Sequence, residues 1–600
     1  MPIVNIDLDW LNRLLGRDFP PQEISESLEQ IGCDVEEVVE VTRSRCPGCQ
    51  ALLENPVGQN EIKTCGFCGH SSETPFQTAG AVKVVRLDLL AARPDLFDVG
   101  GLARALRGTL GILEGLPDYQ VRPSGLRVEV DPSVRSKESY RPYICCAVMT
   151  LPEIDETSLV AIMKLQESLH WGVGRDRKLA SIGIYDLDSL TGDIRYRTLD
   201  PDHESFFPLG SPNCRMTGRQ ILNEHPKGLA YAHLLEGYAR YPLLVDGSGQ
   251  VLSMPPIINS EETRLQMGTR RVFIDITGLS QAAVRKTLNT LVSSLMEMGG
   301  ETESVQIHGL VEGIVATPDL TPGETIIDLV EARRWLGLPL DETSLMGALR
   351  KMRLDVELVP GAAGSFKVRY PAYRTDIRHM VDVFEDIAIG YGYANIEARL
   401  VPSLTIGRAR AEELLTERVR QVLTGLGFSE IMSLPLTTEE DHFERLRMPV
   451  PENYPKISNP KLKSHKVVRT HLMTGLVESL YENRRRPMPL RLFEVDNVVE
   501  LDPETETRTC EERRVAFVEM GREAGYAGLR SLLDALLREL GFGGKYFPID
   551  HPSFVAGRAA SVDAGKPVTG ILGEVHPEVL VRFGLDHPVA IAEVTLFRIF

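Results

Sequence analysis

Four carboxylates are crowded into one short stretch in the second half of the chain. Asp376 precedes a predicted helix, and Asp382, Glu385 and Asp386 stand three and four residues apart within it, which places these three on one helical face. We expect Asp376 to cap that helix. Like charges at this spacing repel one another unless a cation or a basic partner screens them, and carboxylate oxygens suit magnesium. A magnesium site is therefore one interpretation, and an ordinary solvated acidic face is the other.

Cysteines form a second group of residues whose spacing is typical of metal ligands. Two Cys-x-x-Cys pairs, Cys46 with Cys49 and Cys65 with Cys68, are separated by fifteen residues. Two such knuckles predict a closed, tetrahedral and therefore structural zinc site in a zinc ribbon; a redox pair and an unmetallated remnant are the alternatives. The remaining cysteines are scattered, which predicts buried or free thiols rather than disulfides: Cys33, Cys145, Cys146, Cys214 and Cys510.

The helix that carries the carboxylates has a clear apolar side. The residues that recur at helical spacing and should face a core are Ile377, Met380, Phe384 and Ile387. Pro371 cannot lie inside the helix, and Gly390 and Gly392 end it.

An internal repeat surrounds this segment. The pattern Ile6–Leu8, Leu15-Gly16, Leu28 and Asp34–Glu36 recurs at a constant offset, without a gap, as Ile327–Leu329, Leu336-Gly337, Leu349 and Asp355–Glu357. Each copy predicts a helix, a glycine turn, a second helix and an apolar strand, which is a helix-turn-helix-like module. Neither copy has a basic second helix, so a packing scaffold is as good an interpretation as nucleic-acid binding, and we assign no DNA binding.

Composition limits the class of protein. The chain has 600 residues, of which 43% are hydrophobic, so it can bury several cores and should form about four domains. Its formal net charge of −18 argues against a protein that coats nucleic acid with its whole surface, so any RNA contact should be local. The acidic start and the lack of a long apolar run predict a cytoplasmic protein that does not enter a membrane.

The wider segment from Tyr373 to Tyr393, which ends Glu-Asp-Ile-Ala-Ile-Gly-Tyr-Gly-Tyr, resembles the signature of the phenylalanine–tRNA ligase β subunit family. In that family, carboxylates at four such positions hold a magnesium ion near the contact with an α subunit, and all four are present here: Asp376, Asp382, Glu385 and Asp386. The strand 82–89, the turn Arg93–Asp95 and the helix from Gly101 resemble the start of this subunit in its archaeal-type form. The zinc ribbon departs from the usual family pattern, so the resemblance says nothing of its role.

Residues 119–278 alternate strands and helices and should form a mixed α/β unit. Three blocks resemble the family's editing domain, which hydrolyses tyrosine wrongly attached to the phenylalanine tRNA: Leu165–Trp171, Ala180–Asp188 and Pro255–Gly278. A pocket shaped for phenylalanine rejects an added hydroxyl by only about a hundredfold, so a second, hydrolytic site is useful. The polar residues that we nominate to bind the tyrosyl group or orient water are Asp275, Thr277, Asn259 and Ser253. Ordinary turn and cap chemistry is the alternative for these residues.

The last third of the chain resembles a class II synthetase domain. A long amphipathic helix from about 411, resembling the dimer-forming first motif of that class, should bury Ala411, Leu414, Leu415, Val419, Val422, Leu423 and Leu426. Later blocks suggest an antiparallel sheet with helices. The last hundred residues contain no Gly-x-Gly-x-Gly followed by arginine, although ATP-dependent activation needs a positively charged group at the phosphates. We therefore expect a catalytically inactive domain.

Together these features predict an α+β multidomain chain. We expect an N-terminal α/β domain at 1–118 interrupted by the ribbon at about 43–72, an editing-like domain at 119–278, a helix-turn-helix-like module with the magnesium motif at 279–402, and the synthetase-like domain at 403–600. The resemblance implies an (αβ)2 heterotetramer that binds the phenylalanine tRNA, with ATP consumed at an adenylation site on the α subunit. The alternatives are a stand-alone tRNA-binding or trans-editing hydrolase and a zinc-stabilised scaffold without activity.

Overall fold

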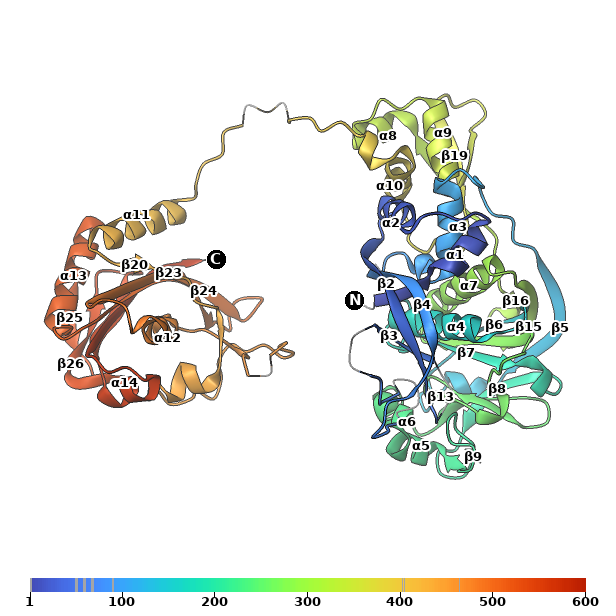
Figure 1. The fold of residues 1–600 in the computed structure, drawn as a ribbon, viewed down its shortest axis with the longest axis horizontal. Coiled ribbons are helices and arrows are strands. Elements are labelled where there is room, and N and C mark those ends of the chain that lie inside the picture. Colours follow the sequence, from blue (N-terminus) through green and yellow to red (C-terminus); the bar gives the residue numbers. More distant parts are fainter. Residues whose placement is uncertain are drawn as a thin grey trace. The chain divides into compact units, whose positions relative to one another are not determined.

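The chain folds into two compact units, 1–400 and 401–600, which are treated separately below (Figure 1). The computed structural model describes residues 3–48, 52–57, 61–65, 70–88, 91–401, 403, 405–462 and 464–599. Among these residues, no helix is both long and apolar enough to cross a membrane.

The first unit begins with a strand, two helices and a long strand: β1 (Ile3–Asp7), α1 (Leu8–Leu15), α2 (Pro21–Gln30) and β2 (Asp34–Arg45). The Asp7 side chain caps α1 by accepting a hydrogen bond from the Trp10 amide at 3.0 Å, and Gly16 ends the helix at φ 74°, a conformation that glycine adopts without steric cost. Two further strands, β3 (Leu52–Pro56) and β4 (Gln77–Asp88), complete a sheet in the order β1-β4-β2-β3.

The predicted repeat appears as the same succession of elements later in this unit. It comprises β17 (Gly323–Asp328), α8 (Leu329–Leu336), α9 (Glu342–Lys351) and β18 (Asp355–Leu358), with β19 (Ser365–Tyr370) between the two strands in the sheet. Asp328 and Gly337 cap α8 as Asp7 and Gly16 cap α1. The same capping residues therefore produce the same helix and turn in both copies.

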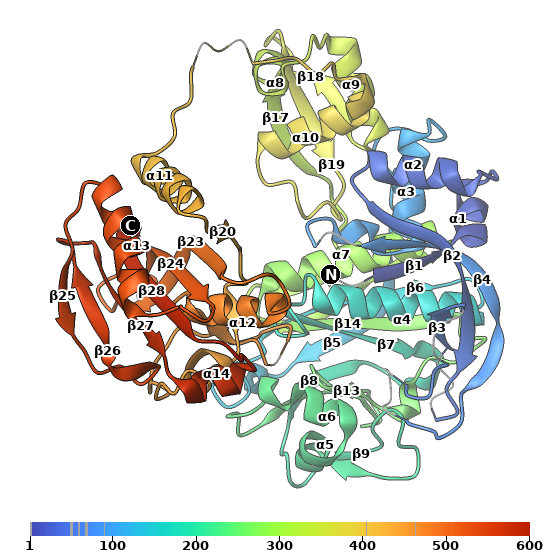
Figure 2. The ribbon, with the colours of Figure 1, turned by 60° about the vertical axis from the view of Figure 1, so that its left-hand side comes forward.

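A ten-stranded sheet forms the centre of the first unit (Figure 2). Its order is β13 (Ile258–Asn259), β12 (Val251–Met254), β11 (Tyr241–Val245), β8 (Ile194–Leu199), β5 (Val121–Val130), β15 (Glu301–Leu310), β6 (Tyr143–Thr150), β14 (Arg271–Gly278) and β7 (Ala180–Asp186), with β16 (Gly313–Thr317) paired to β15. The sheet continues past residue 278 into β15 and β16, so the boundary that we expected there falls inside it.

Alternating side chains of the central strands enter two different cores. In β14, Ile274 and Ile276 belong to a core that the sheet forms with α3 (Val99–Thr109), α4 (Glu156–Trp171) and α7 (Gln281–Glu297). Phe273 points to the other face and belongs to a second core, which includes side chains of β5, β8, β11 and β12. Because β12 and β14 contribute to that second core, the sheet curls and brings its two edges toward each other.

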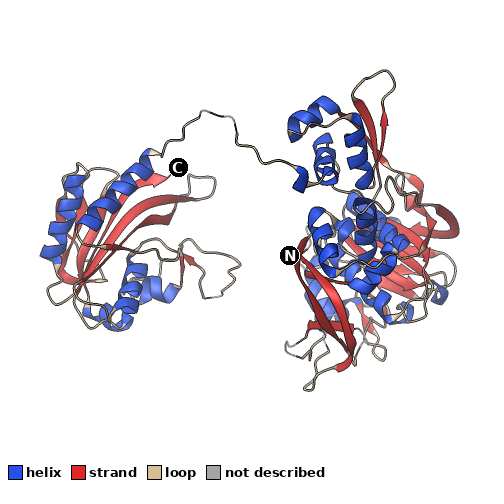
Figure 3. Ribbon diagram, turned by 45° about the horizontal axis from the view of Figure 1, so that its top comes forward, coloured by secondary structure: helices blue, strands red, loops and turns tan. Residues whose placement is uncertain are grey.

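The second unit is built on a seven-stranded sheet in the order β20-β23-β24-β28-β27-β26-β25, antiparallel except where β20 (Ser429–Glu430) meets β23 (Figure 3). Its other strands are β23 (Leu490–Leu501), β24 (Thr509–Met520), β25 (Lys545–Pro548), β26 (Phe554–Asp563), β27 (Thr569–Val575) and β28 (Val589–Ile599). Helices α11 (Ala411–Gly425) and α13 (Tyr526–Glu539) pack on one face, and α12 (Met473–Asn483) and α14 (Pro577–Phe583) on the other.

The apolar side of α11 is narrower than its sequence predicts. Val419 and Leu423 are buried, but Leu414 is 61% exposed and Ala411 is exposed too, so the expectation that these two face the core is wrong. Met432 and Leu434, which follow β20, are 89% and 76% exposed. Three large apolar side chains of the described second unit therefore face solvent near its first helix and strand.

Candidate functional site

The two edges of the curled sheet border a cavity of about 440 Å³ in the first unit. Strand β7 supplies Ser181 and Tyr185 to its lining, and β12, which lies next to the opposite edge strand β13, supplies Ser253. Helix α4 closes a further side. This volume lies within the range of small-molecule sites, which place a few polar groups among apolar walls.

Three hydroxyl and carboxyl groups meet at the bottom of the cavity. The Tyr185 hydroxyl lies 2.5 Å from Asp275 Oδ1 and 2.7 Å from Ser253 Oγ, so strands β7, β14 and β12 are joined at one point. Asp275 is buried, and this burial raises its pKa to about 7 even though the Tyr185 hydroxyl and Arg141 favour the ionised form. A buried carboxyl that titrates near neutrality is characteristic of functional sites.

The close packing of these groups depends on a glycine. Gly183 lies beside Asp275 in the register of β7 and β14, and a Cβ at this position would come within 1.9 Å of the Tyr185 hydroxyl and 2.4 Å of Asp275 Oδ1. Any larger residue would therefore displace the polar group.

Side chains of α4 satisfy the free edge of β7. His170 Nε2 accepts a hydrogen bond from the Ile182 amide at 2.8 Å, and Gln166 donates to the Ile182 carbonyl at 3.0 Å. Burial lowers the pKa of His170 to about 4, so the ring is neutral and can accept this bond. Because main-chain groups alternate along a strand, those of Ile184 face the same open edge and hence the cavity.

An ion pair between buried Arg177 and half-buried Glu167 flanks this edge. Arg177 Nη2 lies 2.7 Å from Glu167 Oε1, and its guanidinium packs 4.3 Å from the centroid of the Tyr231 ring. Arg177 also donates to the Ile257 carbonyl at 3.1 Å, which ties α4 to the segment after β12. Arg177 is therefore part of the cavity wall.

The sequence nominated three of the residues that line this cavity. Asp275, Ser253 and Asn259 belong to the lining, whereas Thr277 is held elsewhere by Arg141, whose Nε donates to the Thr277 hydroxyl at 3.0 Å. Tyr185 was missed as a site residue, although it lies in one of the blocks that carry the resemblance. The pattern of an apolar strand predicts that its tyrosine is an ordinary core residue. Only the pairing of β7 with β14 places Tyr185 beside Asp275.

The hairpin of β2 and β3, which lies in the segment predicted to hold a zinc ribbon, reaches the same cavity. Arg45 at the end of β2 and Leu52 at the start of β3 are both lining residues, and Arg45 forms an ion pair with Glu156 of α4. The segment that departs from the family pattern therefore borders the candidate site.

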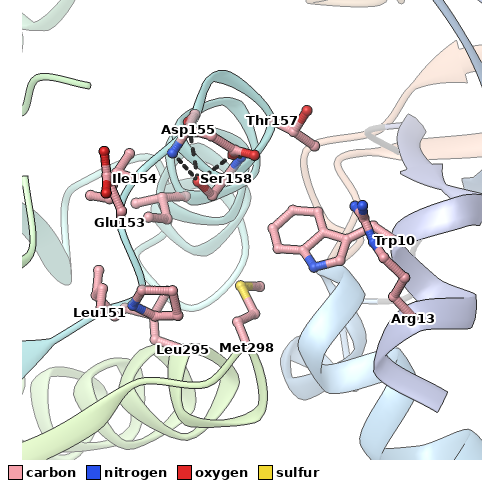
Figure 4. Close-up of a pocket in the computed structure, with 12 residues that line it drawn as sticks. Trp10, Arg13, Leu151, Glu153, Ile154, Asp155, Thr157, Ser158, Leu295 and Met298 are labelled. Carbon is pink, nitrogen blue, oxygen red and sulfur yellow. Dashed lines mark hydrogen bonds between the residues drawn. The ribbon is translucent and has the colours of Figure 1, made fainter. Parts of the chain in front are cut away.

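A smaller hollow of about 160 Å³ lies between α1 and the first turn of α4 (Figure 4). Trp10 and Arg13 face Asp155 and Ser158 across it, and Leu295 and Met298 form part of its floor. Asp155 and Ser158 already satisfy each other and the α4 amides in a capping box, with bonds of 2.7 to 3.1 Å. The larger cavity is therefore the stronger candidate.

The acidic segment folds differently from its prediction. Helix α10 spans Met380–Tyr391, and His379 is its N-cap, so the expectation that Asp376 caps it is wrong. Asp382 Oδ2 accepts hydrogen bonds from the Arg378 and His379 amides at 2.7 Å, which completes the cap. The expected apolar side is correct, with Ile377, Phe384 and Ile387 buried and Met380 packed against the same core.

A buried arginine holds two of the four carboxylates. Arg374 Nη2 lies 2.7 Å from Asp376 Oδ2 and 2.8 Å from Asp386 Oδ2, while Glu385 is exposed. Although burial alone would lower its pKa, Asp386 and Asp376 raise the pKa of Arg374 well above its usual value, so its positive charge is permanent. A divalent cation shared by the same carboxylates would be repelled by that charge. The described residues hold no group of three or more acidic, histidine or cysteine side chains placed to share a metal ion, so the four carboxylates as arranged do not fit a single magnesium ion.

The same arginine joins the acidic segment to the N-terminal region. Arg93 pairs with Asp95 at 2.9 Å, and although burial would raise the pKa of Asp95, Arg93, Arg374 and Arg104 together lower it to about 2. The Arg104 guanidinium lies 3.5 Å from the centroid of the Tyr373 ring. These buried charged and aromatic side chains pack the segment just before α10 against residues 93–104.

Two of the four cysteines of the predicted zinc site lie within the described residues. Cys46 and Cys65 are buried together with Phe76 in one small cluster, whereas Cys49 and Cys68 lie outside the described residues. Among the described residues the scattered cysteines are free thiols, as predicted: Cys33, Cys145, Cys146, Cys214 and Cys510.

In the second unit, carboxylates neutralise three arginines, of which Arg491 and Arg514 lie on the central sheet and Arg469 lies outside it. Arg469 lies 2.7 Å from Glu494, Arg491 lies 2.8 Å from Glu519, and Arg514 lies 3.1 Å from Glu593. An arginine that binds ATP phosphates must be open to them. The arrangement of these three arginines is structural.

Comparisons with known proteins agree with this architecture. Residues 166–307 match the model of the B3/4 domain, 326–393 that of the tRNA synthetase B5 domain, and 396–596 that of the phenylalanyl tRNA synthetase beta chain CLM domain. The cavity lining from Gln166 to Asp275 thus falls within the first of these matches.

Curated relatives match nearly the whole chain. The phenylalanine–tRNA ligase beta subunit of Methanothrix thermoacetophila is 38% identical over 512 residues, covering 85% of this chain and 92% of the relative. That of Methanococcus maripaludis is 33% identical over 600 residues, covering 99% and 100%. The crystal structure of an N-terminal fragment of the phenylalanyl-tRNA synthetase beta-subunit from Pyrococcus horikoshii covers 65% of this chain and 99% of the fragment, with 34% identity and a TM-score of 0.55. The chain belongs to the family of phenylalanine–tRNA ligase beta subunits.

Proposed function

We propose that this ligase subunit removes tyrosine wrongly attached to the phenylalanine tRNA, and that it does so in the cavity between β7 and β12. The observation that carries the proposal is the buried group of Asp275, Tyr185 and Ser253 at the bottom of an otherwise largely apolar pocket. An aromatic ring with one hydroxyl matches such a pocket. Phenylalanine lacks the hydroxyl and would leave the polar group without a substrate partner.

Each part of the cavity has a distinct task in this proposal. Asp275, once ionised, accepts the hydrogen bond of the phenol hydroxyl, and the main-chain groups of Ile184 on the open edge hold the amino acid. A hydrogen bond to a charged group contributes about 1.5–3 kcal/mol, which corresponds to roughly a ten- to hundredfold preference for tyrosine. The ester then lies toward the mouth, where water can reach it.

The test compares two serines of the same sheet-and-helix unit. Ser253→Ala removes a hydroxyl from the polar group, whereas Ser293→Ala removes an equally buried hydroxyl that bonds to the Thr290 carbonyl within α7. We expect Ser253→Ala to slow deacylation of tyrosyl-tRNA and Ser293→Ala to leave it unchanged. Equal rates for the two variants, or no deacylation by the parent protein, would contradict the proposal.

The second unit serves the assembled ligase in this proposal. Its three paired arginines support the inference that adenylation with ATP occurs on an α subunit, within an (αβ)2 assembly that binds the phenylalanine tRNA. The exposed apolar side chains Leu414, Met432 and Leu434 would be covered by that partner. Phenylalanylation should therefore require co-expression with the α-subunit candidate from the same genome. Phenylalanylation by this chain alone would refute the assignment of adenylation to the α subunit. Deacylation of tyrosyl-tRNA without any α subunit would favour a stand-alone editing hydrolase.

Two metal sites belong to the same proposal. Arg374 does not hold Glu385 or Asp382, although Asp382 Oδ2 already caps α10. A magnesium contact at these two residues would therefore need ligands from outside this chain. Asp382→Ala with Glu385→Ala should then weaken association with the α subunit, and unchanged assembly would refute it. A structural zinc ion would be held by Cys46, Cys65 and their partners Cys49 and Cys68.

A further inference from the structure

The strands β2, β3 and β4, which flank the predicted zinc ribbon, form an arm beside α4 (Figures 1 and 2). This arm comprises β2, β3 and the part of β4 that pairs with β2. It belongs to the N-terminal sheet, yet it supplies Arg45 and Leu52 to the lining of the cavity. Leu52 is buried, so the arm is packed against its neighbours and forms a wall there.

A buried carboxylate fastens the arm to α4. Glu54 of β3 is only 4% exposed and lies 2.5 Å from Lys164 of α4 and 3.1 Å from Arg43 of β2. Burial alone would raise the pKa of Glu54, but Lys164, Asn5 and Arg43 lower it below its usual value. The carboxylate is therefore ionised, and its two cations fix the position of β3 along the helix.

Arg45 is held much less firmly than Glu54. Arg45 and its partner Glu156 are 31% and 33% exposed, and an ion pair at such exposure contributes only about 0–1 kcal/mol. Of the other cavity arginines, Arg177 is 8% exposed and lies 2.7 Å from Glu167, whereas Arg264 is 39% exposed and pairs at 2.7 Å with Glu261, three residues before it. Breaking the Arg45–Glu156 pair at the rim therefore costs little free energy. Arg45 can then bind a phosphate in place of Glu156, and a guanidinium group binds phosphate in bidentate geometry.

We propose that the arm is part of the hydrolytic site: Arg45 is a positioning residue for a phosphate of the terminal nucleotides of the tRNA, and Leu52 forms the wall next to the terminal nucleoside. This inference rests on the proposed function of the cavity. The polar group with Asp275 lies at the bottom and reads the amino acid, whereas the exposed Arg45 lies at the rim, where the acceptor strand must enter. Acidic side chains also line the cavity, among them Glu156, Glu167 and Glu261, so an anionic strand needs a cation there.

The test uses two substrates that differ in their phosphates. With the full chain, Arg45→Gln should lower kcat/KM for tyrosyl-tRNA about tenfold, mainly through KM, and leave hydrolysis of 3′-O-tyrosyl-adenosine, which has no phosphate, unchanged. Arg45→Lys should restore part of the loss. The slope of log KM against log salt concentration should fall by about 0.7, the value for one lost phosphate contact to a single strand.

Arg86→Gln is the matched control, because Arg86 lies on β4 of the same arm and pairs with Glu36 and Glu37 away from the cavity. It should leave both substrates unaffected. For the wall, Leu52→Ala should slow hydrolysis of tyrosyl-adenosine as well as tyrosyl-tRNA, and Val57→Ala, at an exposed position of the same arm, should slow neither.

The outcomes separate this inference from the proposed function. If the parent protein deacylates tyrosyl-tRNA and Ser253→Ala impairs it, but Arg45→Gln behaves like Arg86→Gln, the role of the arm is refuted and the cavity assignment stands. An equal loss on both substrates in Arg45→Gln would also refute the phosphate contact, because it would indicate a distorted wall. If neither the parent nor any variant deacylates tyrosyl-tRNA, the cavity assignment itself fails.

Discussion

Replacing Asp275 by asparagine should make the first unit more stable and the cavity less active. The pKa of Asp275 rises from an ordinary value of 3.8 to about 7 because the carboxyl is buried. Such a difference corresponds to about 4 kcal/mol that the folded state forgoes when Asp275 is ionised. Asparagine has nearly the same shape, can still accept a hydrogen bond from Tyr185 and carries no charge.

The free energy of unfolding of the parent protein should fall relative to that of the variant as the pH rises. A carboxyl whose pKa is raised by folding contributes stability at low pH that is lost as the pH rises through the folded value of about 7. The unfolded carboxyl is already ionised at pH 5, whereas the folded one loses its proton only around pH 7, so between pH 5 and pH 8 the parent protein loses about 2.6 kcal/mol that the variant keeps. Above pH 8, where both carboxyls are ionised, the difference stays constant.

Tryptophan fluorescence can follow this unit alone, because the three tryptophans of the chain are Trp10, Trp171 and Trp335, all within residues 1–400. Urea unfolding of parent and Asp275→Asn at pH 5 and pH 8 should show the gap in unfolding free energy widening by about 2–3 kcal/mol at the higher pH. A gap that is independent of pH would refute a raised pKa at this position.

Activity should change in the opposite direction. The ionised carboxylate accepts the phenol hydrogen bond, so deacylation of tyrosyl-tRNA by the parent should increase between pH 6 and pH 8 beyond the uncatalysed rate. Asp275→Asn should lose that rise and fall about tenfold or more in kcat/KM at pH 8. An unchanged profile would contradict the assignment of Asp275 as the group that reads the hydroxyl.

Three further perturbations test other parts of the chain. Asp386→Asn leaves buried Arg374 with one carboxylate partner and should destabilise the first unit by about 3 kcal/mol in tryptophan fluorescence, since a broken buried pair typically costs 3–5 kcal/mol. Glu494→Gln breaks the buried pair with Arg469 and should lower the calorimetric transition of the second unit while the tryptophan transition stays in place. Cys46→Ser combined with Cys65→Ser should abolish bound zinc by elemental analysis, and zinc retained at one equivalent would remove the ribbon assignment.

Each stability test has a neighbouring control. Glu385→Gln alters the exposed carboxylate next to Asp386 and should change stability by less than about 0.5 kcal/mol. Glu500→Gln removes an acid from Arg514 that two others, Glu512 and Glu593, still neutralise. If these controls match the test variants, burial does not govern the energetics of the ion pairs.

Local signals in the sequence predicted the repeated module well. A capping aspartate before each first helix and a glycine after it determine where α1 and α8 begin and end, and these residues act within a few positions of themselves. The apolar side of α10 was correct for the same reason, because helical spacing already places Phe384 and Ile387 on one face.

Long-range contacts account for what the sequence did not reveal. The fate of Asp386 depends on Arg374, twelve residues earlier and outside the helix, so its burial could not follow from the pattern of acids within the helix. Tyr185 and Asp275 are 90 residues apart and meet only because β7 pairs with β14. The exposure of Leu414 likewise depends on how much of α11 its neighbours cover, which periodicity alone does not state.

The curled sheet has a consequence for the solubility of the chain. A sheet whose edges approach without pairing keeps two free rows of main-chain donors and acceptors, and such edges readily add strands from other molecules. Here Gln166 and His170 occupy the outward groups of Ile182, and the arm lies alongside the helix that carries them. Helix α4 and the arm attached to it therefore cover part of this edge, which reduces the main-chain groups that a strand of another molecule could pair with.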